Sequence, residues 1–149
     1  MPFTLQLPTE YPYVIGVATS TIFVNSLHKI LTSKARNAAG IKYPTPYATQ
    51  EQADKDPRAY TFNLAQRAHG NFGENYNSFI ISLLVSGLRY PTLAYWSGAA
   101  WVVGRLAYAY AYTSYGPNGR LPGYVTALVA KSILTWSAVL TCWHMIQDM

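Results

Sequence analysis

The sequence predicts an all-α membrane protein that folds as a bundle of four transmembrane helices. Half of the 149 residues are hydrophobic and only 11% are charged, whereas soluble domains carry roughly 25% charged residues. Aromatic residues make up 15%, with thirteen tyrosines and four tryptophans, as is typical of side chains at a membrane interface. A chain of this length is expected to form one domain, residues 1–149.

The first hydrophobic segment covers about residues 12–32, with Asn25 as its main internal polar group. No basic region precedes it, so we expect it to be retained as a span and not removed as a signal peptide. A polar loop follows, over about residues 31–60. The second helix covers about residues 62–90 and ends before Pro91, because proline disfavours helical conformation in the residue before it.

The third helix covers about residues 92–115, and the turn Gly116-Pro117-Asn118-Gly119 ends it. The fourth helix covers about residues 122–145. The second helix is roughly 43 Å long, against about 30 Å of hydrocarbon, so its polar N-terminal half is expected at the interface. Small residues such as Gly104 let neighbouring membrane helices approach closely.

The basic residues are distributed unevenly along the chain. Six of the eleven lie at the end of the first segment or in the loop after it: Lys29, Lys34, Arg36, Lys42, Lys55 and Arg58. The positive-inside rule therefore places this loop in the cytosol, together with the turn at 116–122, and both termini on the other side. The basic residues do not cluster on a soluble face, so no nucleic-acid partner is expected. The single cysteine excludes an intramolecular disulfide, and without metal-ligand spacing no metal site is expected.

A polar stripe lies within the second helix. At a helical period of 3.6, Arg67, Asn71, Glu74 and Ser78 fall on one face. Charge is costly inside a bilayer, so this face must point at protein, water or a ligand. The third helix carries a second polar and aromatic face, which comprises Arg105, Tyr108, Tyr112 and Tyr115.

We expect these two faces to meet near two further arginines at the helix ends. The candidate site consists of Arg36, Arg67, Asn71, Glu74, Arg105, Tyr108, Tyr112 and Arg120. Several arginines with one carboxylate suit a small zwitterionic ligand that is net anionic, because arginine binds carboxylates bidentately and Glu74 accepts an ammonium. Two alternatives stay open: Arg67 and Glu74 form a structural ion pair, and the tyrosines belong to an interfacial belt.

Two other polar residues are assigned to packing or to the interface. His69 lies about 140° around the helix from Glu74 and is expected at a helix or subunit contact. Lys131, roughly two turns into the fourth helix, is expected to extend its ammonium towards the membrane surface.

Two sequence blocks resemble a known family. They are Phe62–Asn71 with Glu74, and Trp101–Tyr110 with Tyr112. The spacings Arg-x-x-x-Asn-x-x-Glu and Gly-Arg-x-x-Tyr-x-x-x-Tyr occur together, and the loop segments Ser33–Arg36 and Lys42–Pro44 agree. Over about residues 34–144 the chain resembles the MAPEG family, the membrane-associated proteins of eicosanoid and glutathione metabolism. Within that family it is most similar to the third type of microsomal glutathione S-transferase.

The resemblance implies a four-helix bundle that trimerises and binds glutathione between neighbouring subunits. The positions that match glutathione-holding residues are Arg67, Asn71, Glu74, Tyr108 and Tyr112, with Arg36 reaching the carboxylates and Arg105 a motif arginine in the same pocket. Arg120 is the candidate for the catalytic arginine that follows the third helix in the leukotriene-forming synthase. Three positions depart from that synthase, which has tyrosine at Asn75, glutamine at His69 and arginine at Ala107, so leukotriene formation is not implied.

The expected function is that of a membrane-bound glutathione transferase and peroxidase, with glutathione as co-substrate and no metal. A guanidinium at Arg120 favours the thiolate, which is the nucleophilic form of a thiol. The second substrate is expected to be a lipophilic electrophile or a lipid hydroperoxide that enters from membrane lipid. The resemblance implies a homotrimer in the endoplasmic reticulum or nuclear envelope, with the site facing the cytosol. The alternatives are a non-catalytic lipid-binding scaffold of the same family and a small channel or transporter subunit.

Overall fold

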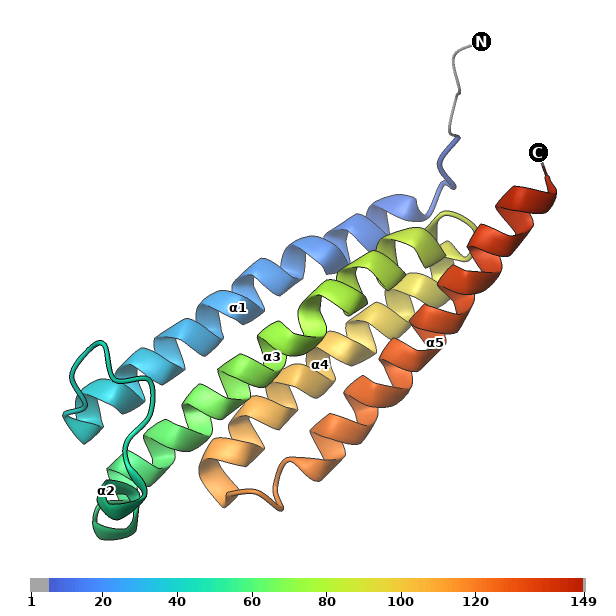
Figure 1. Ribbon diagram of the computed structural model, residues 1–149. Helices are drawn as coiled ribbons and strands as arrows, with labels where there is room; N and C mark the ends of the chain where they lie inside the picture. The colour runs from blue at the N-terminus through green and yellow to red at the C-terminus, as the bar shows by residue number, and fades with distance from the viewer. Residues whose placement is uncertain (1–5, 149) are drawn as a thin grey trace.

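Four long helices lie side by side in a bundle, and one short helix lies in the loop between the first two of them (Figure 1). The computed structural model describes residues 6–148. The helices are α1 (Tyr11–Ala39), α2 (Gln50–Lys55), α3 (Pro57–Gly87), α4 (Pro91–Tyr115) and α5 (Leu121–Gln147). No strand occurs within the described residues. The all-α prediction is confirmed, whereas the crossing of a membrane by all four long helices stays a prediction.

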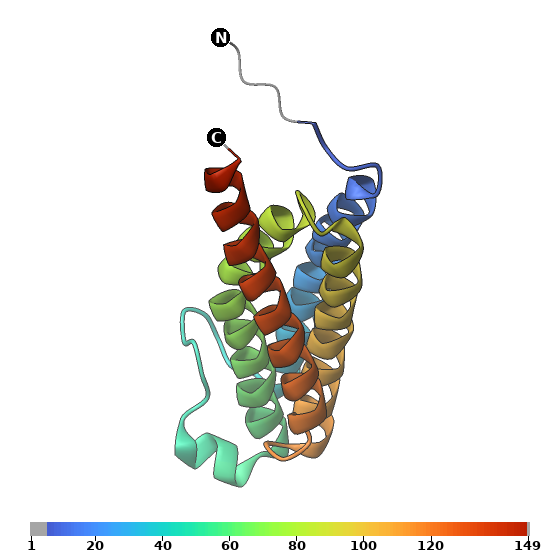
Figure 2. The ribbon, with the colours of Figure 1, turned by 90° about the vertical axis from the view of Figure 1, so that its right-hand side faces the viewer.

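The long helices alternate in direction. The start of α1 and the end of α5 lie at one end of the bundle, and the α1–α3 connection and the α4–α5 turn lie at the other, as both views show (Figures 1 and 2). α3 and α4 occupy the middle, because each of them packs against α1, α5 and the other. Within the described part of the chain, α1 and α5 do not pack against one another.

The outer and middle helices differ in polarity. Among the described helices, α1 and α5 are long and apolar enough to cross a membrane, whereas α3 and α4 do not reach the same hydropathy. The outer helices expose large apolar side chains such as Phe23 and Trp136. All four long helices bury some polar side chains, among them Ser86 and Arg105 in the middle helices and His28 in α1. The lower hydropathy of α3 and α4 accompanies their place in the bundle, where each packs against the three other long helices.

The first helix is longer than expected. α1 runs to Ala39, seven residues beyond the expected end, and Gly40 follows with a φ of 65°. The extension is helical because one of its faces is buried: Thr32 and Arg36 pack inward, while Lys34 and Asn37 stay exposed. The polar loop that was expected from about residue 31 therefore begins only at Gly40.

The short helix α2 was not predicted. Thr49 accepts a hydrogen bond from the Gln52 amide, and the Gln52 side chain accepts one from Thr49, so a capping box starts α2. Asp56 then caps α3 by accepting a hydrogen bond from the Arg58 amide. The Arg58 side chain also donates to both oxygens of Asp56, which lowers the pKa of that carboxyl. α3 begins five residues earlier and ends three residues earlier than the predicted 62–90.

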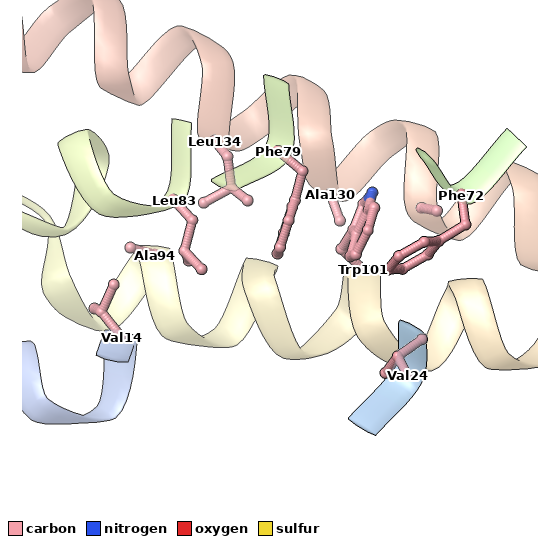
Figure 3. Close-up of a cluster of buried hydrophobic side chains, with 10 residues drawn as sticks. Val14, Val24, Phe72, Phe79, Leu83, Ala94, Trp101, Ala130 and Leu134 are labelled. Carbon is pink, nitrogen blue, oxygen red and sulfur yellow. The ribbon is translucent and has the colours of Figure 1, made fainter. Parts of the chain in front are cut away.

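The apolar core joins α3 to α4 and α5. The rings of Phe79 and Trp101 stack with centroids 3.7 Å apart (Figure 3). Leu83 and Leu134 pack in the same fully buried cluster (Figure 3). This packing fixes the register of α3 against α4, and with it the relative positions of the polar residues nearer the loop end.

α4 and α5 approach closely near the loop end of the bundle. A Cβ on Gly104 would lie 2.9 Å from the backbone nitrogen of Ala127, and one on Gly123 would overlap the backbone of Tyr108. Both positions therefore require glycine, and this close approach sets Tyr108 beside the start of α5.

Candidate functional site

The polar stripe of α3 forms a connected set of side chains. Arg67 Nη1 donates to Glu74 Oε1 at 3.0 Å, and Asn71 Nδ2 donates to Glu74 Oε2 at 3.3 Å. The predicted common face of these three residues is confirmed. The side chains of Arg67 and Glu74 are 51% and 54% exposed, so this ion pair lies at the surface of the subunit and is open to a ligand or to a neighbouring protein.

Arg105 of α4 connects to this stripe. Its Nη2 donates to Asn71 Oδ1 at 3.0 Å, so Asn71 bridges Glu74 and Arg105. The guanidinium also lies 4.8 Å from the centre of the Tyr108 ring. Arg105 is only 2% exposed. The predicted meeting of the two polar faces is therefore confirmed, with Arg105 on the inner side and Arg67 on the outer side.

The tyrosines and Arg120 complete the loop end of the site. Tyr108 and Tyr112 are buried, with ring centroids 5.4 Å apart. Arg120 precedes α5, and its Cζ lies 5.4 Å from the centre of the Tyr112 ring. A pocket of about 250 Å³ is lined by Asn71, Tyr108, Arg120, Leu121 and Tyr124. The structure thus brings together three of the sequence-predicted residues around one pocket.

Arg36 lies apart from this pocket. Its guanidinium lies 4.2 Å from the centre of the Tyr43 ring and 4.6 Å from that of Phe62, and its Nη1 donates to the Thr45 carbonyl at 2.7 Å. Arg36 is only 5% exposed. Within the single chain it therefore attaches the loop to the first turns of α3, and its contact with a ligand carboxylate stays a prediction.

Sequence reasoning misplaced one residue near the site, Lys131, and missed another, Tyr124. Lys131 was expected to extend towards the membrane surface, but its Nζ donates to Asn75 Oδ1 at 2.7 Å, inside the bundle. Tyr124 was not singled out, although it follows Arg120 by one helical turn and lines the pocket. Lys131 follows Tyr124 by seven residues, so helical periodicity places both on one face of α5.

His69 lies at a contact between helices. Its ring is 5.9 Å from that of His28 in α1, and His28 in turn lies 5.0 Å from Phe72. The expectation of a helix contact is confirmed within the subunit. Among residues 6–148, no three His, Cys, Asp or Glu side chains gather in a way that could hold a metal ion.

The charges of the site favour an anionic ligand. Three guanidinium groups, those of Arg67, Arg105 and Arg120, accompany the single carboxylate of Glu74. A ligand that carries carboxylates and one ammonium complements this set, because guanidinium groups bind carboxylates with paired hydrogen bonds. The phenol groups of Tyr108 and Tyr112 add hydrogen-bonding capacity beside an apolar surface.

A comparison with protein-family models matches most of the chain. The MAPEG family model matches residues 14–140, which is more than four fifths of the chain. The match includes every candidate site residue from Arg36 to Arg120, and it extends from α1 into the last turns of α5.

Proposed function

Because the chain belongs to the MAPEG family, we propose that it is a membrane-bound glutathione transferase with glutathione peroxidase activity, of the third microsomal type. Members of this family include glutathione transferases and related membrane proteins. The observation that carries the proposal is the pocket in which Asn71, Tyr108 and Arg120 meet, beside the ion pair of Arg67 and Glu74.

Glutathione has two carboxylates, one ammonium and one thiol, and the site offers complements for a carboxylate, the ammonium and the thiol. Arg67 supplies an exposed guanidinium for a carboxylate, and Glu74 supplies the acceptor for the ammonium. Asn71 is held by Arg105 on its oxygen side and therefore presents its amide in a fixed direction. We place the thiol at the loop end of the pocket, next to Arg120 and Tyr108.

Arg120 is proposed to stabilise the thiolate. A cation beside the sulfur lowers the pKa of a thiol, and only the thiolate is a good nucleophile. In conjugation, the sulfur attacks an electrophilic carbon and forms a C–S bond. In a substitution the leaving group departs with its bonding electron pair, and in an addition the π electrons move to the neighbouring carbon, which then takes a proton. In peroxide reduction, it attacks the terminal peroxide oxygen, the O–O bond breaks, and the alkoxide takes a proton to leave as an alcohol. A second glutathione then reacts with the sulfenic acid to give the disulfide and water.

The substitution Arg120→Ala tests this role. We expect turnover to fall by roughly 100-fold or more, as when one preorganised charge-stabilising group is removed, while glutathione affinity changes by less than about threefold. The assay measures reduction of a lipid hydroperoxide and conjugation of a generic electrophile by purified protein in detergent. Arg58→Ala is the matched control, because Arg58 is exposed and pairs with Asp56 away from the pocket. Unchanged turnover in Arg120→Ala would refute the assignment.

One observation favours a second candidate, a lipid-binding scaffold without catalysis. An apolar groove of about 490 Å³ lies between α4 and α5 and is lined by Trp96, Ser97, Ala100, Val125, Thr126, Val129, Ala130 and Ile133. Such a groove accommodates a lipid chain whether or not glutathione binds. Equilibrium binding of glutathione to the detergent-solubilised protein separates the two candidates, since an absence of binding would favour the scaffold.

The proposed location is the endoplasmic reticulum or nuclear envelope, with the pocket facing the cytosol. Two apolar helices and the family indicate a membrane protein. The pocket lies at the same end of the bundle as the basic α1–α3 connection, and basic loops are retained on the cytosolic side. The proposed assembly is a homotrimer.

A further inference from the structure

A small cavity lies between α3, α4 and α5, farther from the loop end of the bundle than the pocket assigned to glutathione. Its volume is about 30 Å³, which is room for about one water molecule. Its walls are Asn75, Trp101, Arg105, Tyr124, Ala127, Leu128 and Lys131. Two cationic side chains therefore border a space that is large enough for one small polar group. Tyr124 also lines the pocket assigned to glutathione, so a single side chain contributes to both spaces.

The two cations lack an anionic partner. Lys131 Nζ donates to the amide oxygen of Asn75 at 2.7 Å, and Arg105 donates to the amide oxygen of Asn71 at 3.0 Å. Arg105 Nε is buried and has no hydrogen-bond partner within the described residues. The ion pairs found in residues 6–148 involve other cations: Lys55, Arg58, Arg67 and Arg89. Because cations inside a membrane protein usually pair with an anion or mark a binding site, this pair points to an anionic ligand.

The surroundings define what kind of anion fits. Tyr124 and Leu128 form the outer wall and are 42% and 44% exposed, on a helix that is apolar enough to cross a membrane. A ligand that arrives from the bilayer therefore meets an apolar surface first and the two cations behind it. The cavity admits a carboxylate oxygen, whereas the headgroup phosphate of a two-chain phospholipid is too large for 30 Å³.

We propose that Lys131 and Arg105 form a binding site for the carboxylate of a single-chain acidic lipid, whose hydrocarbon chain lies along the exposed face of α5. Lys131 is the residue that selects a free acid over its ester, since it is partly exposed whereas Arg105 is fully enclosed. Binding of the acid stands independently of catalysis. That the bound acid is also the substrate, a fatty-acid hydroperoxide, rests on the proposed function.

The experiment measures fatty-acid binding without glutathione. The full chain is placed in nanodiscs of neutral phosphatidylcholine, and a fluorescent fatty acid is displaced with palmitate or with methyl palmitate. We expect palmitate to compete at least tenfold better than its ester. Lys131→Met should weaken palmitate binding about tenfold and leave the affinity for the ester unchanged within twofold. Lys131→Arg should retain the preference for the acid over the ester. Lys29→Met is the control, because it removes an equal charge from the exposed face of α1.

A second variant keeps Lys131 in place. Asn75→Asp sets a carboxylate of nearly the same shape against Lys131 Nζ, so we expect it to weaken palmitate binding as Lys131→Met does. Equal affinity for acid and ester, or unchanged palmitate binding in both variants, would overturn the proposal. Displacement of the probe by phosphatidylserine vesicles as effectively as by palmitate would also overturn it, in favour of a phospholipid site.

Glutathione turnover is measured separately. In the wild type, kcat/KM should be about tenfold higher for a free fatty-acid hydroperoxide than for its methyl ester, and Lys131→Met should abolish this ratio. Acid-selective binding without turnover of either substrate would retain the carboxylate site and refute the proposed glutathione chemistry. Turnover of both substrates with the same kcat/KM would refute the use of the carboxylate site by the peroxide substrate and retain the chemistry.

Discussion

Glu74 accepts hydrogen bonds from both Arg67 and Asn71, yet more than half of its side chain is exposed. An exposed ion pair contributes little to stability, because water and salt screen it. We therefore predict that Glu74→Gln leaves the thermal unfolding midpoint nearly unchanged. The same substitution should weaken glutathione binding roughly tenfold, since a charge-assisted hydrogen bond to the ammonium is lost. Calorimetric titration with glutathione and a thermal melt in the same detergent measure the two effects.

The control is Glu51→Gln, which breaks the exposed pair of Glu51 and Lys55 in α2. It should alter neither the glutathione affinity nor the thermal unfolding midpoint. A large loss of stability in Glu74→Gln, with glutathione affinity unchanged, would mean that the Arg67–Glu74 pair is structural. The sequence leaves this choice open because spacing shows that the two residues share a face, but it does not show how exposed that face is.

Periodicity predicted most of the site at the level of single helices. The stripe Arg67, Asn71 and Glu74 meets Arg105 as expected, because both helices are regular and the Phe79–Trp101 stack fixes their register. Arg36 was harder to place, because its surroundings depend on the path of the loop through Tyr43 and Thr45. Lys131 was misplaced because a lysine in an apolar helix has no sequence mark that distinguishes an interfacial ammonium from one that pairs with Asn75.

Helix boundaries were less predictable than helix faces. The composition of residues 33–39 is polar, which suggested a loop, yet Thr32 and Arg36 continue the buried face of α1. The start of α3 depends on the Asp56 cap and on Pro57 at the first helical position. Both signals are short and lie outside the apolar pattern, so a prediction based on hydrophobicity alone places the start too late.

The close approach of α4 and α5 is predicted to depend on Gly123. Gly123→Ala puts a methyl group into the backbone of Tyr108, and overpacking of this kind typically costs about 1–3 kcal/mol. We expect a lower unfolding midpoint and weaker glutathione binding, because α4, which carries Tyr108, and α5, which Arg120 directly precedes, are forced apart. Gly16→Ala is the matched control. No atom lies within 4 Å of its added Cβ, and alanine is the better helix former. Unchanged stability in Gly123→Ala would contradict this account of the packing.

At the scale of the whole molecule, the candidate site is open on its outer side. Arg67 and Glu74 stay about half exposed, and the outer helices α1 and α5 present apolar faces that lipid or another subunit can cover. A cyclic trimer would place a neighbouring subunit against the exposed ion pair and exclude water from it, which strengthens electrostatic binding.

We therefore predict that light scattering in mild detergent gives a protein mass of about 50 kDa, three times that of the 16.6-kDa chain. Glutathione affinity should fall at least tenfold in a harsher detergent that gives folded monomers, as verified by circular dichroism. A helical monomer that binds glutathione with undiminished affinity would show instead that one chain completes the site, and that the exposure of Arg67 and Glu74 serves ligand entry alone.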